Sequence, residues 1–468
     1  MTGPAGGTGA PGRDPDPGRA APPIDTGAAE QVVVALPTTG GLKGKTLSAE
    51  AFHEHAAHGG FALAAYLVAT DADMTPDPYF PSLGEGTGDL RAIPDPDAVY
   101  HPSWLESTAL VLADAVDPAD GTPVPHAPRT ILRRQIDRLA ADHGLTARLG
   151  VETEAYAYRV TARQAHRTGY TGLDQQLAGS FNGDYALDHE GPMRNLLATF
   201  ARVLKDSRIP LETVKTEAGF GQLEVTYPPT APLPACDRHQ VVKLAARAVA
   251  EQVGMSVSFM AFPHAGQSPS GLHLHLSLTD PDGAAVFAAD GDGGGGNALS
   301  ERARHILAGC LEFLPEVALL YAPTHNSYKR YGQPFTTSAL TWGHDNRSAA
   351  LRITGHGANR RIEMRLAGAD ADAHLAAAAL LAAVRHGLDH RLPLTDEPIA
   401  GLATVPSPAR ALPTSLAESA ARFDQSALAR KAFGDDVVAH YVHAATLDVA
   451  ALRNHVTDWE MNHGFSRA

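Results

Sequence analysis

Several features that define other classes of protein are scarce in this 468-residue sequence. Its two cysteines, Cys236 and Cys310, are too few for a disulfide framework and lack the paired spacing of a metal site, which indicates a reducing cytoplasm. The longest apolar run, residues 375–384, is far shorter than the about 20 residues that span a bilayer, and we expect a buried helix there. The net charge of −14 argues against the basic face that nucleic-acid binding requires. These absences predict a cytoplasmic protein with neither nucleic-acid nor membrane partners.

The remaining composition is that of a globular chain with more than one domain. Apolar residues make up 44% of the sequence, which is enough for a large core. Residues 1–30 are rich in Gly, Pro, Ala and Asp without an apolar segment, and we expect a flexible tail. Short β-like segments between Gly- and Pro-rich connections predict a small sheet domain over residues 31–124. Apolar residues at helical spacing, ended by Gly144, open a second domain over residues 125–468, where strands alternate with long helices. The predicted fold class is α+β.

Some shorter stretches predict local structure. Apolar residues within 193–204 and 416–428 have helical spacing, and we expect one helix in each stretch. The glycine run at residues 290–297 is expected to be a surface loop. Residues 44–46 resemble the end of a phosphate-binding P-loop, but Thr39 stands where the upstream glycine should be. We therefore expect a simple turn of the small sheet domain there.

Four segments alternate chemically capable side chains with apolar or small ones, so that a strand would present the first set on one face. Three of them carry Glu152, Glu154, Tyr156 and Tyr158; His273, His275 and Ser277; and Arg361, Glu363 and Arg365. In the fourth segment, Glu217 and Glu224 stand at the two ends of a Gly-rich turn, which could bring them together across a hairpin.

Taken singly, each segment could be the solvent-facing side of a half-exposed strand. Together they supply five glutamates, two histidines and two arginines without a lysine, which is unusual for a solvent face. Carboxylates that gather in one cavity repel each other unless cations hold them. Oxygen-rich ligation with a single imidazole favours Mg²⁺ or Mn²⁺ over zinc. Arginines within residues 323–330 and 346–352 add fixed positive charge that suits phosphate, so the set indicates phosphoryl transfer.

In these motifs the chain resembles the glutamine synthetase family, specifically its bacterial type I branch. The paired-Glu strand, the Glu-turn-Gln-x-Glu hairpin, Ser-Gly-x-His-x-His, Asn-Ser-Tyr-Lys-Arg, Asn-Arg-Ser and Arg-x-Glu-x-Arg follow in family order. The resemblance implies an N-terminal β-grasp domain and a catalytic domain whose antiparallel sheet forms an active-site funnel surrounded by helices. It also implies a homo-oligomer, a dodecamer of two hexameric rings with active sites between neighbouring subunits.

The resemblance also implies a role for each matching residue. Glu154, Glu217 and Glu224 would hold one Mg²⁺ or Mn²⁺ ion and Glu152, His273 and Glu363 another, with two to three ions per active site. Arg330, Arg365, Gly271 and His273 would bind glutamate, and Glu212, His275, Ser277, Arg352 and Arg361 would bind ATP. Arg347, Arg330 and Asp89 would act in catalysis, with Arg347 on the transferring phosphate. Asp89 matches one aspartate of the family's small domain, and a second is either Asp73 or missing.

The implied reaction begins with glutamate and ATP. A carboxylate is a poor acyl donor, so its oxygen first attacks the γ-phosphate, and an amine then displaces phosphate from the acyl phosphate. Metal ions and arginines would neutralise the charge on the phosphoryl oxygens.

The segment expected to cover the nitrogen site departs from the family pattern. Residues 330–341 are one residue shorter than usual and contain no acid, and Phe335 or Thr336 stands at the position of a flap glutamate. A true glutamine synthetase needs carboxylates there to strip a proton from ammonium. We therefore interpret the chain as a glutamate–amine ligase similar to the γ-glutamylpolyamine and γ-glutamylethanolamide synthetases of the family, acting in amine and nitrogen utilisation. The alternatives are a true glutamine synthetase with a remodelled flap, and a non-catalytic paralogue that serves as a scaffold or sensor.

Overall fold

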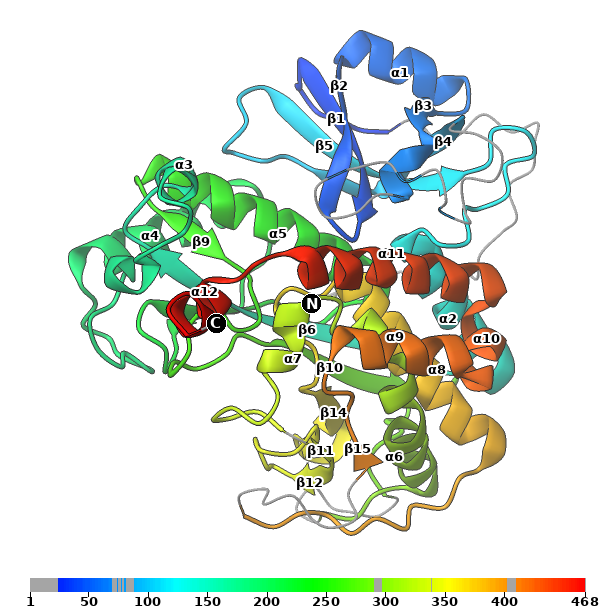
Figure 1. The fold of residues 1–468 in the computed structure, drawn as a ribbon. Helices are drawn as coiled ribbons and strands as arrows, with labels where there is room; N and C mark the ends of the chain where they lie inside the picture. The colour runs from blue at the N-terminus through cyan, green and yellow to red at the C-terminus, as the bar shows by residue number, and fades with distance from the viewer. Residues whose placement is uncertain are drawn as a thin grey trace, which may run out of the picture.

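Two large β-sheets, a separate two-stranded pair and surrounding helices form the described part of the computed structural model of this chain (Figure 1). It describes residues 24–69, 74, 77, 80, 88–289, 297–337, 339–401 and 410–467. Residues 1–23 of the expected tail, Asp73 and the glycine run at residues 290–296 lie outside the described residues. The predicted α+β class is confirmed. Within the described ranges, no helix is long and apolar enough to cross a bilayer.

The first sheet has five strands. In spatial order they are β2 (Gly41–Ser48), β1 (Gln31–Thr38), β5 (Thr108–Val116), β4 (Asp89–Tyr100) and β3 (Phe61–Ala64). β1 and β5 pair in parallel, and the other neighbours are antiparallel. Residues 44–46 lie within β2, so the turn predicted there was wrong. Gly44 is required because a Cβ atom at this position would lie 1.8 Å from the carbonyl oxygen of Val34 on the paired strand. Ile24 is buried in the core of this sheet, so the chain is already packed here before β1 begins.

The second sheet has eight strands and carries the motifs of interest. Its path is β12 (Trp342–His344), β13 (Leu351–Thr354), β14 (Arg361–Met364), β10 (Leu272–Thr279), β6 (Thr146–Tyr158), β8 (Gln222–Thr226) and β7 (Thr213–Thr216), and β9 (Ser256–Ser258) pairs with β6. The neighbours are antiparallel except for β12 and β13, which are parallel. β11 (Ala339–Leu340) and β15 (Arg410–Ala411) form a separate pair.

The helices surround these sheets. They are α1 (Ala49–Ala57), α2 (Pro128–His143), α3 (Ala162–Arg167), α4 (Gly191–Asp206), α5 (Pro232–Gln252), α6 (Glu301–Phe313), α7 (His325–Lys329), α8 (Ala373–His390), α9 (Leu416–Gln425), α10 (Ala427–Phe433), α11 (Asp435–Asn454) and α12 (Asp458–Gly464). Among the described residues there are also 3₁₀ helices, namely η1 (Ala65–Val68), η3 (Leu173–Gln176), η4 (Leu314–Leu320) and η5 (Gly357–Asn359).

Most predicted helices are confirmed. α2 ends at Gly144, whose φ of 66° is in the left-handed region that glycine adopts easily. α4 covers the stretch at residues 193–204, and α8 contains the buried apolar run. The single helix predicted over residues 416–428 was wrong. Ser426 has extended backbone angles and accepts a hydrogen bond at Oγ from the amide of Ala429, so one helix ends there and α10 begins.

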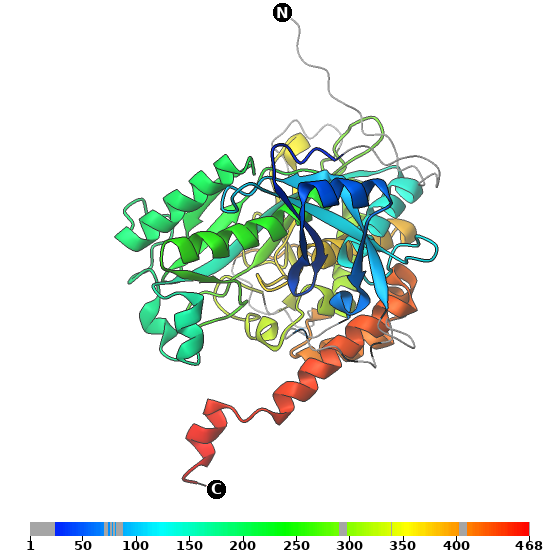
Figure 2. The same ribbon diagram turned by 90° about the horizontal axis from the view of Figure 1, so that it is seen from above.

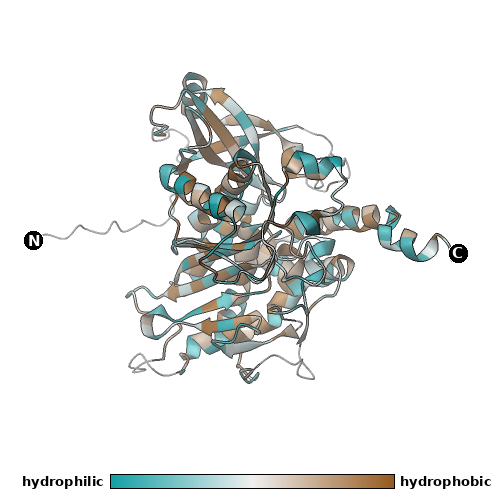
Figure 3. Ribbon diagram, turned by 90° about the vertical axis from the view of Figure 1, so that its left-hand side faces the viewer, coloured by the Kyte–Doolittle hydropathy of each residue, from teal (hydrophilic) through white to brown (hydrophobic). Residues whose placement is uncertain are grey.

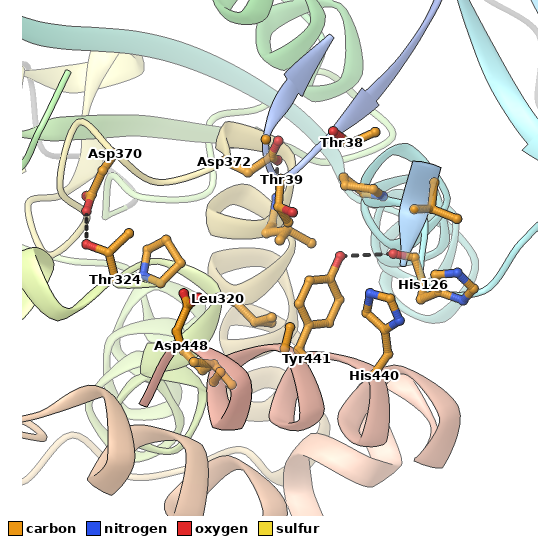
Figure 4. Close-up of a pocket in the computed structure, with 18 of the residues that line it drawn as sticks. Thr38, Thr39, His126, Leu320, Thr324, Asp370, Asp372, His440, Tyr441 and Asp448 are labelled. Atoms are coloured by element: carbon orange, nitrogen blue, oxygen red, sulfur yellow. Dashed lines mark hydrogen bonds between the residues drawn. The ribbon is translucent and has the colours of Figure 1, made fainter. Parts of the chain in front are cut away.

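α11 lies along the junction between the first sheet and the rest of the chain (Figure 1). The Tyr441 hydroxyl donates a 2.9 Å hydrogen bond to the carbonyl oxygen of His126, and the rings of His126 and His440 stack with centroids 4.4 Å apart (Figure 4). A cavity of about 150 Å³ lies beside these contacts, between the β1–β2 turn, the start of α8 and α11. Its described lining includes none of the predicted site residues, so the candidate chemistry lies elsewhere.

The C-terminal segment leaves the body of the molecule. α12 stands at the end of an arm that projects beyond the other elements (Figures 2 and 3). Large apolar side chains of this arm, Val456, Trp459 and Phe465, are exposed in the single chain.

Candidate active site

A cleft of about 160 Å³ at the second sheet gathers half of the predicted site residues. Its lining includes Glu152, Glu154, Asp184, Tyr185, Lys215, Glu217, Glu224, His273, Arg330, Pro334, Phe335, Thr336, Arg347 and Arg365. Glu363 lies beside it, with Oε1 3.7 Å from His273 Nδ1. The five glutamates and one imidazole predicted to hold metal ions therefore converge.

The register of the sheet explains this convergence. Glu152 on β6 lies opposite His273 on β10, and Glu154 lies opposite Glu224 on β8. On the far side of β10, His275 lies opposite Glu363. Directly opposed residues of antiparallel strands point to the same face at close range, so three separate cross-strand pairs deliver their side chains to one place. The alternate leucines of β10 are buried beneath that face, as predicted.

The predicted metal ligands Glu152, His273 and Glu363 form one compact group. His273 Nδ1 lies 2.5 Å from Glu152 Oε1, and His275 Nε2 lies 3.3 Å from Glu152 Oε2. Burial opposes ionisation of Glu152, but the adjacent His273 and His275 hold the pKa of that carboxyl well below its usual value. Burial and the charge of Arg365 lower the pKa of His273, which favours the neutral imidazole, the form that binds a metal ion.

The other predicted ligands, Glu154, Glu217 and Glu224, form a crowded carboxylate group. Glu154 Oε2 accepts hydrogen bonds from the Gly271 amide at 2.9 Å and from Gln222 Nε2 at 3.0 Å. Burial, followed by the charges of Glu217 and Glu152, raises the pKa of Glu154 to about 8. Burial, Glu152 and Glu217 likewise raise the pKa of Glu224 to about 10. Both shifts reflect negative charge that a divalent cation would relieve.

The donor set fits a divalent ion that prefers oxygen ligands. Two trios, Glu152, His275 and Glu363, and Glu152, Glu154 and His273, have ligand atoms within 4.8 Å of one another. Four or more carboxylates with imidazole suit Mg²⁺ or Mn²⁺. The second trio joins residues that the family resemblance assigned to two different ions, since Glu152 and Glu154 lie on the same face of β6.

Lys215 was not predicted, yet it lies among these carboxylates. Its Nζ contacts Glu217, lies 3.3 Å from Glu224 Oε2 and 3.9 Å from Asp184 Oδ1, and stands over the Tyr185 ring. Burial opposes its charge, but the hydrogen bond and charge of Glu217 and the charge of Glu224 raise the pKa of Lys215. Its position on β7, two residues before Glu217, was the available signal. Asp184 and Tyr185 belong to a loop that carries no such periodicity.

Two arginines hold Glu363. Arg365 contacts its carboxylate directly, and Arg352 Nη1 donates to Glu363 Oε2 at 2.8 Å. Although burial opposes ionisation, the charges of Arg365, His275 and His273 lower the pKa of Glu363 to about 2. Arg361 Nε lies 3.4 Å from His275 Nδ1, so this arginine also borders the cluster.

The residues predicted for glutamate binding lie on one side of the cluster. Arg330 is buried and its Nη1 donates to the carbonyl oxygens of Arg365 at 3.1 Å and Leu366 at 3.3 Å. Gly271 brings its backbone close to this side, since a Cβ atom there would lie 2.5 Å from His273 Nε2 and 2.8 Å from Arg330 Nη2. A side chain at position 271 would therefore disturb both residues.

Three predicted residues lie farther out. Ser277 follows His275 on the same face of β10, and Glu212 is exposed immediately before β7. Asp89 begins β4 in the first sheet and does not line the cleft of its own chain. Its predicted role requires the cleft of a neighbouring subunit.

Residues 125–463 match the glutamine synthetase catalytic domain. The chain is 41% identical over 449 residues to the gamma-glutamylethanolamide synthetase GlnA4 of Streptomyces coelicolor, covering 95% of this chain and 94% of that relative. It is 32% identical over 434 residues to a glutamate–isopropylamine ligase of a Pseudomonas species, covering 91% and 93%. The solved structure described as apo GmaS without ligand has a TM-score of 0.78 at 24% identity, covers 93% of this chain and 97% of that one, and shows the shared fold. The chain therefore belongs to the glutamine synthetase family and is a ligase that forms carbon–nitrogen bonds, as its motifs predicted.

Proposed function

We propose that this protein uses ATP to form γ-glutamyl phosphate from glutamate and passes the glutamyl group to an organic amine, with a primary monoamine of the ethanolamine type as acceptor. The observation that carries the proposal is the composition of the flap over the cleft. Pro334, Phe335 and Thr336 line the cleft without an acid among them, and the Phe335 side chain is 68% exposed. An apolar, partly open flap suits an acceptor with a carbon chain better than ammonium.

The charges at the cleft favour one amino group over several. Lys215 and Arg347 line it as fixed cations, beside the carboxylates expected to bind metal ions. A polyamine would bring two or more ammonium groups toward these cations, and like charges at this range repel. The names of the two relatives above, an ethanolamide synthetase and an isopropylamine ligase, support a monoamine.

The remaining roles are those that the family resemblance implies, and the placement of most of these side chains at the cleft supports them. The carboxylate cluster with His273 would hold Mg²⁺ or Mn²⁺, which supplies charge neutralisation for the phosphoryl group. We propose that Arg330 and Arg365 bind glutamate and that Arg347 binds the transferring phosphate. The nucleotide is proposed to contact Glu212, His275, Ser277, Arg352 and Arg361.

An amine panel tests this function. The protein is incubated with ATP, Mg²⁺ and glutamate plus ammonium, ethanolamine, isopropylamine, putrescine or spermine, and phosphate release and γ-glutamyl products are measured. We expect ethanolamine or isopropylamine to give the highest kcat/KM. Ammonium as the best substrate would identify a true glutamine synthetase, and inactivity with every amine would favour a non-catalytic paralogue. Glu363→Gln serves as the inactive control.

We also propose a cytoplasmic homo-oligomer of the double-ring type. Asp89 does not line the cleft of its own chain, and the projecting arm exposes apolar side chains that a second copy would cover. Mass photometry of the full chain measures the assembly, and a monomer at micromolar concentration would contradict this proposal.

A further inference from the structure

We infer that Asp184 is the carboxylate that binds the acceptor amine and takes its proton, in place of the flap acid that this chain lacks. The inference rests on the proposed amine-ligase function and names the group that makes the amine nucleophilic. At neutral pH a primary amine arrives protonated and has no lone pair for attack, so some group at the site must accept a proton.

Among the acidic residues in the described lining of the cleft, one is not a predicted metal ligand. The acidic residues there are Glu152, Glu154, Asp184, Glu217 and Glu224. The four glutamates are the predicted metal ligands, and their oxygens are turned toward one another, His273 and Lys215. Asp184 is the remaining carboxylate, and it has no counterpart among the motifs in the sequence.

Asp184 lies at the outer side of the carboxylate group. Its side chain is 39% exposed, compared with 19% for Glu217 and 9% for Glu224. Its Oδ1 lies 3.9 Å from Lys215 Nζ, which shows that the carboxylate is directed into the cleft toward the predicted metal ligands. Asp184 is therefore the most accessible of these three carboxylates, and it shares the cleft with Phe335 of the flap.

The backbone on both sides of Asp184 is attached to β7. The hydroxyl of Thr216 donates a 2.5 Å hydrogen bond to the carbonyl oxygen of Gly183, and the amide of Tyr185 donates to the carbonyl oxygen of Thr216 at 3.3 Å. Thr216 is the residue between Lys215 and Glu217. The loop therefore holds Asp184 at a set distance from the cluster, as a positioned proton acceptor requires.

The charges that face Asp184 support the same role. Burial and the charge of Glu217 raise the pKa of Asp184, while Lys215 and Arg347 oppose the shift. A carboxylate with a raised pKa is a stronger base, which suits a group that takes a proton from an ammonium group.

The proposed step balances as follows. The ammonium group of the acceptor transfers one proton to a carboxylate oxygen of Asp184, which leaves a neutral amine. The nitrogen lone pair attacks the carbonyl carbon of γ-glutamyl phosphate, so that a C–N bond forms and the C–O bond to phosphate breaks. Phosphate leaves with the bonding electrons and takes the second proton from the nitrogen, which leaves the neutral amide.

Asp184→Asn tests the inference with two nucleophiles. Ethanolamine is mainly protonated at pH 7, whereas hydroxylamine is mainly neutral and needs no proton acceptor before attack. We expect kcat/KM for ethanolamine to fall about 10²- to 10⁴-fold, the usual contribution of a general base, and that for hydroxylamine to change far less. The KM values for glutamate and ATP should stay close to those of the wild type. Asp188→Asn is the matched control, because Asp188 is exposed on the same loop and does not line the cleft.

The outcomes separate the alternatives. If Asp184→Asn lowers kcat/KM equally for ethanolamine and hydroxylamine, or lowers neither, Asp184 is not the proton acceptor and the inference is overturned. A selective loss of ethanolamine activity in Asp89→Asn but not in Asp184→Asn would place the base on a neighbouring subunit instead. A wild-type protein that ligates no amine would overturn the proposed function itself. Thermal unfolding verifies that the Asp184→Asn variant is folded, and Asp184→Glu should restore part of the ethanolamine activity.

Discussion

Replacing Lys215 with methionine should destabilise the metal-free protein and tighten its binding of divalent metal ions. The Lys215 ammonium group contacts Glu217 and lies 3.3 Å from Glu224, two of the carboxylates expected to bind a metal ion. Methionine retains most of the side-chain volume but removes the charge. In the metal-free variant these carboxylates would repel each other without a compensating cation.

The magnitude follows from burial. Removing one partner of a fully buried ion pair costs about 3–5 kcal/mol, and an exposed pair is worth about 0–1 kcal/mol. The Lys215 side chain is 19% exposed, so we expect a cost of about 1–3 kcal/mol to the metal-free protein. A bound metal ion neutralises the same carboxylates and cancels most of this cost. The variant therefore loses about 1–3 kcal/mol more stability without metal than with it. This difference makes metal binding roughly 5- to 150-fold tighter than in the wild type, since 1.4 kcal/mol corresponds to a factor of ten.

Isothermal titration calorimetry with Mn²⁺ measures the affinity, and thermal unfolding with and without metal measures the stability of each state. Lys205→Met is the matched control, because Lys205 is exposed in the last turn of α4. We expect the control to bind metal like the wild type. Unchanged or weaker metal binding by Lys215→Met would refute the reasoning, because Lys215 would then neither compete with the ion nor balance its ligands.

Three other perturbations have defined outcomes. Glu363→Gln removes the carboxylate that Arg352 and Arg365 share and should lower metal-dependent kcat by about 100-fold or more, as measured in a Mg²⁺ titration of activity. Leu380→Ala opens a cavity in buried α8 and should cost about 2–5 kcal/mol in urea unfolding, whereas Leu187→Ala, at a side chain that is 97% exposed, should change stability little. Burial lowers the pKa of His126 from 6.5 to about 4, so the unfolded chain binds more protons and stability falls as the pH drops from 6.5 toward 4. His126→Gln should remove up to about 3 kcal/mol of this acid sensitivity, as measured by unfolding at several pH values.

The strands and faces of the site were predictable because alternation is a local property. The glutamates of β6 and the histidines of β10 alternate with small or apolar residues, and a strand has only one way to bury the latter. Local alternation does not predict which strands pair or in which register. That His273 lies opposite Glu152 depends on a register between segments 121 residues apart, which local periodicity does not contain.

Three further features were missed or wrongly predicted from the sequence, each because it depends on tertiary contacts or on a local cap. Asp184 is held at the cleft by the hydrogen bonds that its neighbours Gly183 and Tyr185 make with Thr216, and no spacing in the sequence encodes these tertiary contacts. The break at Ser426 was missed because the apolar pattern continues through it while the serine caps a new helix. Residues 44–46 read as a turn because glycine favours one, yet here the small side chain allows two strands to approach.

Because two arginines contact Glu363, the binding of one substrate is expected to affect the affinity for the other. Arg352, on the proposed nucleotide side, and Arg365, on the proposed glutamate side, both contact this one carboxylate. A substrate that recruits either arginine changes the free energy of the other contact, and such linkage acts equally in both directions. Glutamate and nucleotide would therefore influence each other's affinity through a single buried side chain, without any movement of one sheet relative to the other.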